Sequence, residues 1–138
     1  FSPGEDCLQK IKSLFRSVRK KVDVCVFTIT DNRIVEEMVA AHLRKVAIRI
    51  ITDDDKSLDR GSDIGRLEDL GVPLRRDQSR HHMHHKYAIF DDSRVLTGSY
   101  NWTRSAAEYN EENIIVSDDS RLRGLFSQHF EQLWDEVA

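Results

Sequence analysis

Two short apolar runs with a helical pattern between them constrain the fold of this chain more than any other feature. Residues 22–29 (VDVCVFTI) and residues 46–52 (VAIRIIT) are rich in β-branched side chains and have the length of buried strands. Between them, Asp31 stands where it can cap a helix over residues 32–45. This order predicts a parallel strand pair, because parallel strands need a crossover connection.

The rest of the chain predicts further strands and helices around these two runs. Gly71 can end a helix over residues 64–70, and the tight connection over residues 91–94 predicts a hairpin. The other predicted segments are an amphipathic helix ending near Lys20, a polar loop over residues 53–61, a strand around Leu74, strands over residues 86–90, 94–97 and 113–116, and a helix over residues 120–134. The predicted fold is α/β, with a mixed, largely parallel β-sheet flanked by helices on both faces.

Composition agrees with one domain over residues 1–138. The chain is 39% hydrophobic and 33% charged, which fits a globular domain with its own core. No apolar run approaches the ~20 residues that cross a bilayer, so we expect no membrane span within this chain.

The sequence opens at Phe1, so an anchor, a signal peptide or another domain could precede it. Cys7 and Cys25 form neither a disulfide framework nor a four-thiolate metal site, which favours a reducing compartment such as the cytoplasm.

Residues 84–101 carry the pattern on which a functional prediction can be based. They read HHKYAIFDDSRVLTGSYN and contain H-x-K-x4-D followed by G-S-x-N. Because side chains alternate along a strand, His84 and Lys86 are expected on one face of the sheet. Lys86, the Asn101 amide and the Ser99 hydroxyl can donate to the oxygens of a phosphodiester. The neutral imidazole of His84 can attack phosphorus without a metal.

This pattern resembles the motif of the phospholipase D superfamily, which is matched at His84, Lys86, Asp91, Gly98, Ser99 and Asn101. The sequence is most similar to the small single-motif members, the bacterial Nuc-like endonucleases and the Zucchini or mitochondrial phospholipase D group. Their GSxNWT and E-N segments look like residues 98–103 and 112–113. The resemblance implies a phospholipase D-like fold and catalysis by His84, Lys86, Asp91, Asn101 and Glu112. Within that set, it implies that Glu112 orients the nucleophile and that Asp91 acts structurally or electrostatically.

A single copy of the motif has a consequence for assembly. A leaving oxygen needs a proton from an acid on the far side of phosphorus, and one histidine cannot be nucleophile and acid at once. In the superfamily that this chain resembles, two motif copies form one site. We therefore expect a two-fold homodimer in which one His84 forms a phosphohistidine and the other acts as acid, with no metal and no cofactor.

Residues 81–85 (HHMHH) contain four histidines, a histidine tract that could also be read as a zinc site, but this reading is not favoured. Adjacent histidines rarely provide a catalytic zinc set, and the tract contains no Cys, Asp or Glu. His81 and His82 are interpreted as surface residues, and His85 should face away from the nucleophile. His42 and His129 lie on predicted helices and are interpreted as ordinary surface residues. Trp102 and Trp134 are predicted to anchor the core.

The charges around the motif favour nucleic acid as the substrate. Four arginines, together with Ser99, are predicted to bind a polyanion along its backbone: Arg75, Arg76, Arg80 and Arg104. We expect an endonuclease acting on DNA or RNA, single-stranded rather than duplex. The alternatives are a phospholipid hydrolase acting on cardiolipin or another phosphatidyl lipid, and a non-catalytic nucleic-acid-binding domain. Two cysteines cannot build the zinc finger of the animal Zucchini proteins, which favours the Nuc-like branch.

Overall fold

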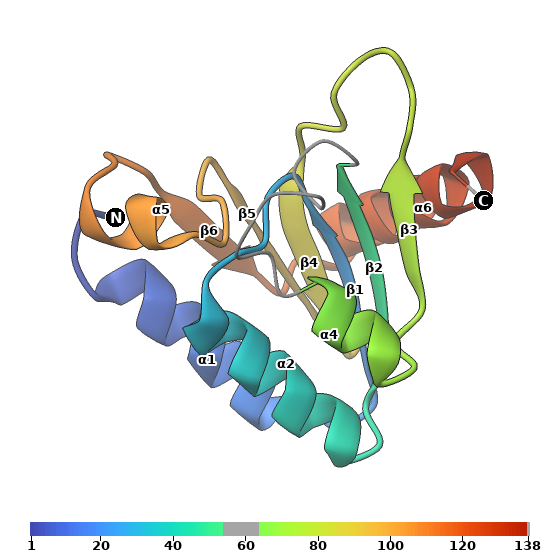
Figure 1. The fold of residues 1–138 in the computed structure, drawn as a ribbon, viewed down its shortest axis with the longest axis horizontal. Helices are drawn as coiled ribbons and strands as arrows, with labels where there is room; N and C mark the ends of the chain where they lie inside the picture. The colour runs from blue at the N-terminus through green and yellow to red at the C-terminus, as the bar shows by residue number, and fades with distance from the viewer. Residues whose placement is uncertain (54–63, 138) are drawn as a thin grey trace.

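The computed structural model describes residues 1–53 and 64–137, so most of the loop predicted over residues 53–61 lies outside the described residues. Six strands form one sheet in the order β3-β2-β1-β4-β5-β6, with helices on both faces (Figure 1). The strands are β1 Lys21–Val26, β2 Ala47–Asp53, β3 Leu74–Asp77, β4 Lys86–Phe90, β5 Arg94–Gly98 and β6 Ile114–Ser117. The helices are α1 Asp6–Ser17, α2 Asn32–Leu43, α4 Ile64–Asp69, α5 Arg104–Glu108 and α6 Ser120–Glu136.

The pairing of the strands confirms a mixed sheet and corrects the predicted proportion of parallel to antiparallel pairs. Strand β2 pairs in parallel with β1 and β3, whereas the β1–β4, β4–β5 and β5–β6 pairs are antiparallel. The sheet is therefore parallel only in its first half, and the expectation of a largely parallel sheet was wrong. The reason is that β4 follows β3 without a crossover helix, and β4 and β5 are joined by a tight turn in which Asp91 and Asp92 have positive φ.

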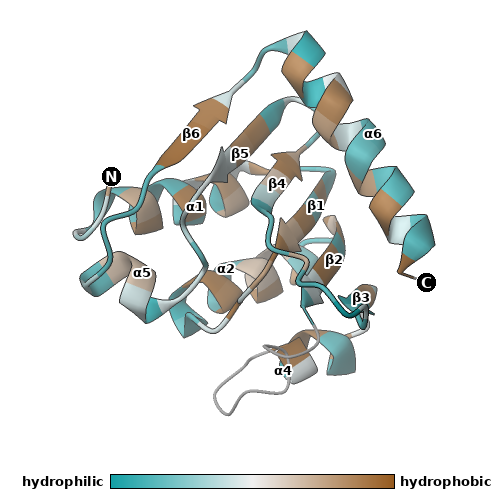
Figure 2. Ribbon diagram, turned by 90° about the horizontal axis from the view of Figure 1, so that it is seen from above, coloured by the Kyte–Doolittle hydropathy of each residue, from teal (hydrophilic) through white to brown (hydrophobic). Residues whose placement is uncertain are grey.

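The core has one layer on each face of the sheet. Figure 2 shows α1, α2 and α5 on one side and α6 along the other. On the first side, Phe15 of α1 packs edge-on against Trp102, which is fully buried as predicted. On the second side, Phe130 of α6 is fully buried, and Trp134 stacks against it while remaining partly exposed. No helix in the described ranges is long and apolar enough to cross a membrane.

Several helix ends follow from specific side chains. Asp31 caps α2 as predicted, since its carboxylate accepts the backbone N–H of Arg33 at 3.0 Å. Helix α5 was not predicted; Thr103 caps it by accepting the N–H of Ala106 at 3.1 Å. Helix α1 ends at Ser17, earlier than expected.

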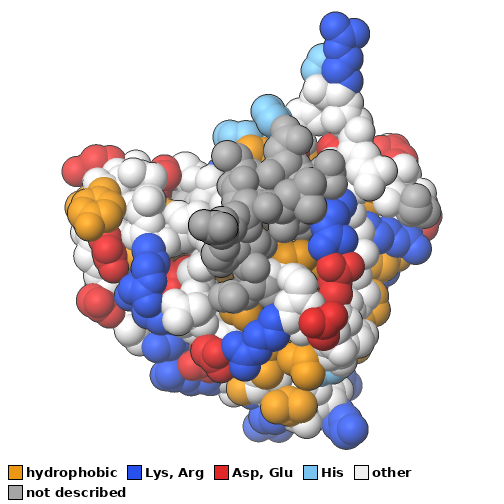
Figure 3. Space-filling view, in the orientation of Figure 1, with side chains coloured by type: hydrophobic (Ala, Val, Ile, Leu, Met, Phe, Trp, Pro, Cys, Tyr) orange, Lys and Arg blue, Asp and Glu red, His pale blue; other side chains and the backbone are white. Residues whose placement is uncertain are grey.

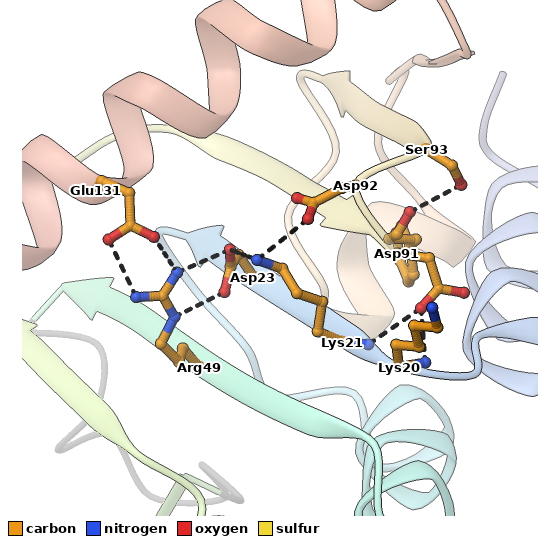
Figure 4. A network of polar contacts seen from close by, with 9 residues as sticks. Lys20, Lys21, Asp23, Arg49, Asp91, Asp92, Ser93 and Glu131 are labelled. Atoms are coloured by element: carbon orange, nitrogen blue, oxygen red, sulfur yellow. Dashed lines mark hydrogen bonds and ion pairs between the residues drawn. The ribbon is translucent and has the colours of Figure 1, made fainter.

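Asp91 lies at the end of β4 away from His84 and binds the connection between α1 and β1 (Figure 4). Its carboxylate accepts the backbone N–H groups of Arg19, Lys20 and Lys21 at 3.0, 2.7 and 3.0 Å. Burial acts to raise the pKa of Asp91, but these donors outweigh burial and hold the pKa below its ordinary value. The structure thus does not bring Asp91 to the other predicted catalytic residues, and its contacts are those of a structural residue.

We expect Asp91→Asn to lower the free energy of unfolding by about 2 kcal/mol, because a charged acceptor of three hydrogen bonds is lost. Urea denaturation at pH 7 measures this change. Because the pKa of Asp91 is lowered in the folded state, its contribution is present above the ordinary Asp value of about 3.9 and is lost as pH falls through the folded pKa. The wild-type and variant curves should therefore converge in acid.

Asp92→Asn is the matched control for this measurement. Asp92 occupies the same turn with positive φ, but its exposed carboxylate makes only a surface ion pair with Lys21, at 3.4 Å. A loss of stability no larger in Asp91→Asn than in Asp92→Asn would contradict the structural role.

Candidate active site

Five of the predicted site residues meet at one edge of the sheet: His84, Lys86, Ser99, Asn101 and Glu112. This edge holds the carboxyl ends of β1, β2, β3 and β5 and the amino ends of β4 and β6. Ligands of open α/β sheets bind at such an edge. A hollow of about 470 Å³ lies there and is lined by His84, His85, Lys86, Thr97, Gly98, Ser99, Asn101 and Glu112.

His84 and Lys86 line the hollow and are in contact with each other. The Nζ atom of Lys86 lies 2.9 Å from Nδ1 of His84 and donates to the His84 carbonyl oxygen at 2.7 Å. Phe27, which follows β1, packs beside both side chains: its ring centroid is 4.7 Å from that of His84 and 5.4 Å from the Lys86 Nζ. The base and the cation are therefore held together, as their spacing in the sequence predicted.

The surroundings of this pair favour a neutral imidazole beside an ammonium group. Burial, and then the positive charge of Lys86, lower the pKa of His84. Burial also lowers the pKa of Lys86, and the negative charge of Glu112 opposes that effect. Glu112 thus raises the pKa of Lys86 through its charge. The group that contacts Nδ1 of His84 is the Lys86 ammonium and not the Glu112 carboxylate. The predicted contact between Glu112 and the ring of His84 is not among the hydrogen bonds of the described residues.

The G-S-x-N segment is shaped by a close approach of two strands. A Cβ atom on Gly98 would lie 2.1 Å from the Asn113 carbonyl oxygen, and the φ of Gly98 is +155°. Ser99 continues this contact, since its N–H donates to the Asn113 carbonyl and its hydroxyl accepts the Asn113 N–H, both at 3.1 Å. Asn101 accepts the Thr28 N–H through Oδ1 at 3.2 Å, which leaves its NH₂ group for a phosphate oxygen.

We expect Gly98→Ala to separate β5 from β6 at the hollow, because no shift of a flexible side chain can relieve a clash with a backbone oxygen. The free energy of unfolding should fall by about 3 kcal/mol, measured by urea denaturation. Gly124→Ala is the control: Gly124 is a helical position with open space around it, so the same methyl group should raise stability by about 0.5–1 kcal/mol. Equal effects at the two positions would contradict this account.

Asp53 lies at the same edge of the sheet, and the sequence did not lead us to predict it as a residue of the site. This carboxylate is 3% exposed at the end of β2; it accepts the Met83 N–H at 3.1 Å and lies 3.4 Å from Nδ1 of His82. It therefore supports the segment that precedes His84. An acidic residue directly after a buried strand was the signal that could have indicated it. His82 is exposed as predicted, but its contact with Asp53 makes it more than a plain surface residue.

The other histidines fall into two places. His85 points toward α6, where its ring centroid is 4.8 Å from that of His129 and 5.7 Å from that of Tyr87. The Tyr87 hydroxyl lies 2.7 Å from Nδ1 of His129, so His129 is a packing residue rather than the simple surface residue expected. His42 lies 2.8 Å through Nε2 from the Leu70 carbonyl, outside the hollow. Within the described residues, no group of three side chains that could hold a metal is present.

The four predicted substrate-binding arginines do not assemble around the hollow. Arg75 lies over the Trp134 ring, with its guanidinium carbon 4.1 Å from the ring centroid, and donates to the Trp134 carbonyl. Its guanidinium group therefore links β3 to α6. Arg76 pairs with Glu68, and Arg104 binds Asn32. On the face seen in Figure 3, basic side chains are interspersed with acidic ones rather than joined in one tract. Arg80 and Arg104 remain exposed, the former on the β3–β4 connection.

Fold and site together define a domain of the phospholipase D type. The sequence matches the family described as "Cardiolipin synthase, PLD-like domain" over residues 11–134, and the chain belongs to this phospholipase D-like family. It is 41% identical to a mitochondrial cardiolipin hydrolase of Chlamydomonas reinhardtii over 98% of this chain and 60% of that protein. It is 35% identical to the human mitochondrial cardiolipin hydrolase over 96% of this chain and 53% of that protein. The chain thus spans little more than half the length of these curated relatives.

Solved structures agree with the assignment. The chain superimposes on Nuc from Salmonella typhimurium, a phospholipase D family member, with a TM-score of 0.88 and 28% identity, over 95% of this chain and 88% of Nuc. NucT from Helicobacter pylori has the same fold, with a TM-score of 0.84 and 24% identity over 95% of this chain and 89% of NucT. The sequence identity with the cardiolipin hydrolases is higher than the identity with Nuc. The comparisons therefore do not support the preference for the Nuc-like branch that was based on the number of cysteines.

Proposed function

We propose that this chain is a metal-independent phosphodiesterase, most simply an endonuclease, whose nucleophile is His84 in a site shared by two subunits. The observation that supports this proposal most strongly is the contact between the His84 imidazole and the Lys86 ammonium in the lining of a polar hollow. A phosphate oxygen is a stronger acceptor for an ammonium group than an imidazole nitrogen. A bound phosphodiester would therefore draw Lys86 toward the substrate and release the ring of His84 for attack.

The reaction needs two steps and two histidines. In the first step, His84 forms a bond to phosphorus, the bond to the leaving oxygen breaks, and His84 of the second subunit gives that oxygen a proton. In the second step, water attacks the phosphohistidine, its proton passes to the second histidine, and the first is regenerated. Lys86, Ser99 and Asn101 hold the phosphate oxygens throughout, and Glu112 balances the charge of Lys86.

Two substrate classes are consistent with this chemistry. Nucleic acid, single-stranded in preference to duplex, is favoured by the exposed guanidinium group of Arg80 on the β3–β4 connection. Cardiolipin or another phospholipid is the second candidate, because the similar curated proteins are named for cardiolipin hydrolysis. A binding domain without activity is disfavoured, because both His84 and Lys86 are present and in contact.

One digest panel tests this function. Purified protein is offered single- and double-stranded DNA, RNA and cardiolipin-containing vesicles, each with and without EDTA, and the His84→Asn variant serves as the blank. We expect cleavage of the single-stranded nucleic acids that survives chelation, because Lys86 and its symmetry mate neutralise the phosphate. A requirement for added metal would exclude the mechanism, and cleavage of the vesicles alone would select the lipid candidate.

A further inference from the structure

A buried carboxylate beside the hollow is paired with the segment of chain that leads into His84. We infer that Asp53 and His82 are positioning residues of the reaction, which together hold the His84 imidazole in the place from which it attacks phosphorus. The inference rests on the proposed function, since it assigns both residues to the reaction of His84.

The segment that carries His84 has no regular secondary structure of its own. Residues 78–85 connect β3 to β4 and lie outside both strands. Figure 1 shows this connection rising beyond the edge of the sheet before it enters β4. Since no strand pairing fixes residues 82–84, other contacts must hold them. The placement of a reacting group matters, because a displacement of about 1 Å can cost about 100-fold in rate.

Asp53 provides such contacts from the end of β2. Its carboxylate is 3% exposed, accepts the Met83 N–H at 3.1 Å and lies 3.4 Å from Nδ1 of His82. Met83 is itself buried, with its Sδ 3.5 Å from the Cys25 Sγ. An ionised carboxylate is costly to bury unless it is paired and hydrogen-bonded. The pairing therefore holds residues 82 and 83 close to Asp53.

Phe27 joins this anchored segment to His84. The Phe27 ring centroid lies 5.4 Å from that of His82 and 4.7 Å from that of His84, so both imidazoles pack against one ring. The Phe27 N–H donates to the His85 carbonyl at 2.9 Å, on the other side of His84 along the chain. His84 thus stands between two anchored backbone positions. Loss of the contacts with Asp53 should leave its ring with more than one orientation.

The charge of Asp53 also reaches His84. Burial, the charge of Lys86 and the charge of His82 lower the pKa of His84, in this order, whereas the negative charge of Asp53 raises it. Asp53 and Lys86 therefore act on His84 in opposite directions. A residue that acted only by packing would not move the pH at which His84 becomes neutral, so this opposition can be tested.

The first test measures kcat and KM for a generic phosphodiester, bis(p-nitrophenyl) phosphate. His82→Leu removes the group beside Asp53 and should lower kcat about 10-fold, with KM within about twofold of the wild-type value. His82→Asn keeps an N–H donor near the position of Nδ1 and should restore most of that loss. His81→Leu is the matched control, the same change at an exposed histidine of the same segment. The His82 side chain is 59% exposed, so a thermal melt should show the fold retained.

The second test follows the protonation of His84 by NMR titration of its ring, which needs no turnover. Asp53→Asn keeps an oxygen for the Met83 N–H and removes the charge. The pKa of His84 should fall, because the group that raises it is lost. The acid limb of kcat/KM should then move to lower pH, opposite to the direction expected when the charge of Lys86 is removed.

The outcomes separate this inference from the proposed function. A His82→Leu variant as active as His81→Leu, or a His84 titration unchanged in Asp53→Asn, would overturn the positioning role while leaving the reaction intact. A loss carried by KM instead of kcat would also overturn it and would assign His82 to substrate binding. A wild type that hydrolyses neither this phosphodiester nor any substrate of the digest panel would overturn the proposed function and the positioning role together.

Discussion

Replacing His84 with Asn is expected to reduce turnover by about 10⁴-fold or more while leaving the fold intact, because the amide cannot form the covalent intermediate. The imidazole is exposed and lies at the edge of the sheet, so its removal leaves no cavity in either core layer. Single-turnover hydrolysis of a labelled substrate measures the loss, and a thermal melt checks the fold. His81→Asn is the matched control, because His81 is exposed in the same segment and does not line the hollow.

The same variant also tests whether two subunits share one site. When wild-type and His84→Asn subunits exchange freely, a site that needs both histidines is complete only in wild-type homodimers. Activity should then follow the square of the wild-type fraction, with mixed dimers nearly inactive. Activity that falls in simple proportion to that fraction would show that each chain holds a complete site.

The sequence predicted most of the fold because its strands have clear local signals. The β-branched runs of β1 and β2 and the cap at Asp31 were recognised from neighbouring residues alone. The share of parallel strand pairs was overestimated, because the direction of β4 relative to β1 depends on how the chain returns after β3 and not on the composition of the strand. The five-residue helix α5 was missed because it is too short to show a helical period.

The candidate site was predictable to the extent that spacing determines geometry. His84 and Lys86 meet because they stand two residues apart at the start of a strand, and the G-S-x-N segment follows one hairpin later. The role of each arginine was not predictable. Arg75 packs on Trp134, 59 residues away in the chain, and only the packing of α6 against the sheet shows that its guanidinium group is occupied. The role of Asp53 was missed because its partner, the Met83 N–H, is a backbone group 30 residues away in the chain, and the position of Asp53 after a buried strand does not identify that partner.

Replacing Lys86 with Met should lower kcat/KM by about 10²–10³-fold, because the main positive group facing the phosphate is lost while the aliphatic part of the side chain is kept. This variant also changes the pH dependence in a defined direction. His84 must be neutral to attack, and its pKa is lowered by burial first and by the charge of Lys86 second. Without that charge the pKa of His84 should rise, so the neutral form should appear only at higher pH.

The acid limb of the kcat/KM profile should therefore move to higher pH in Lys86→Met, whereas Lys86→Arg, which keeps the charge, should leave the limb near its wild-type position. The two His84 side chains of a shared site titrate together, so each limb belongs to the pair and not to one residue. The comparison between Met and Arg is still decisive, because both variants change the shape of the side chain and only one removes its charge. An acid limb that moves to lower pH, or that moves equally in both variants, would mean that Lys86 does not control the protonation of the nucleophile.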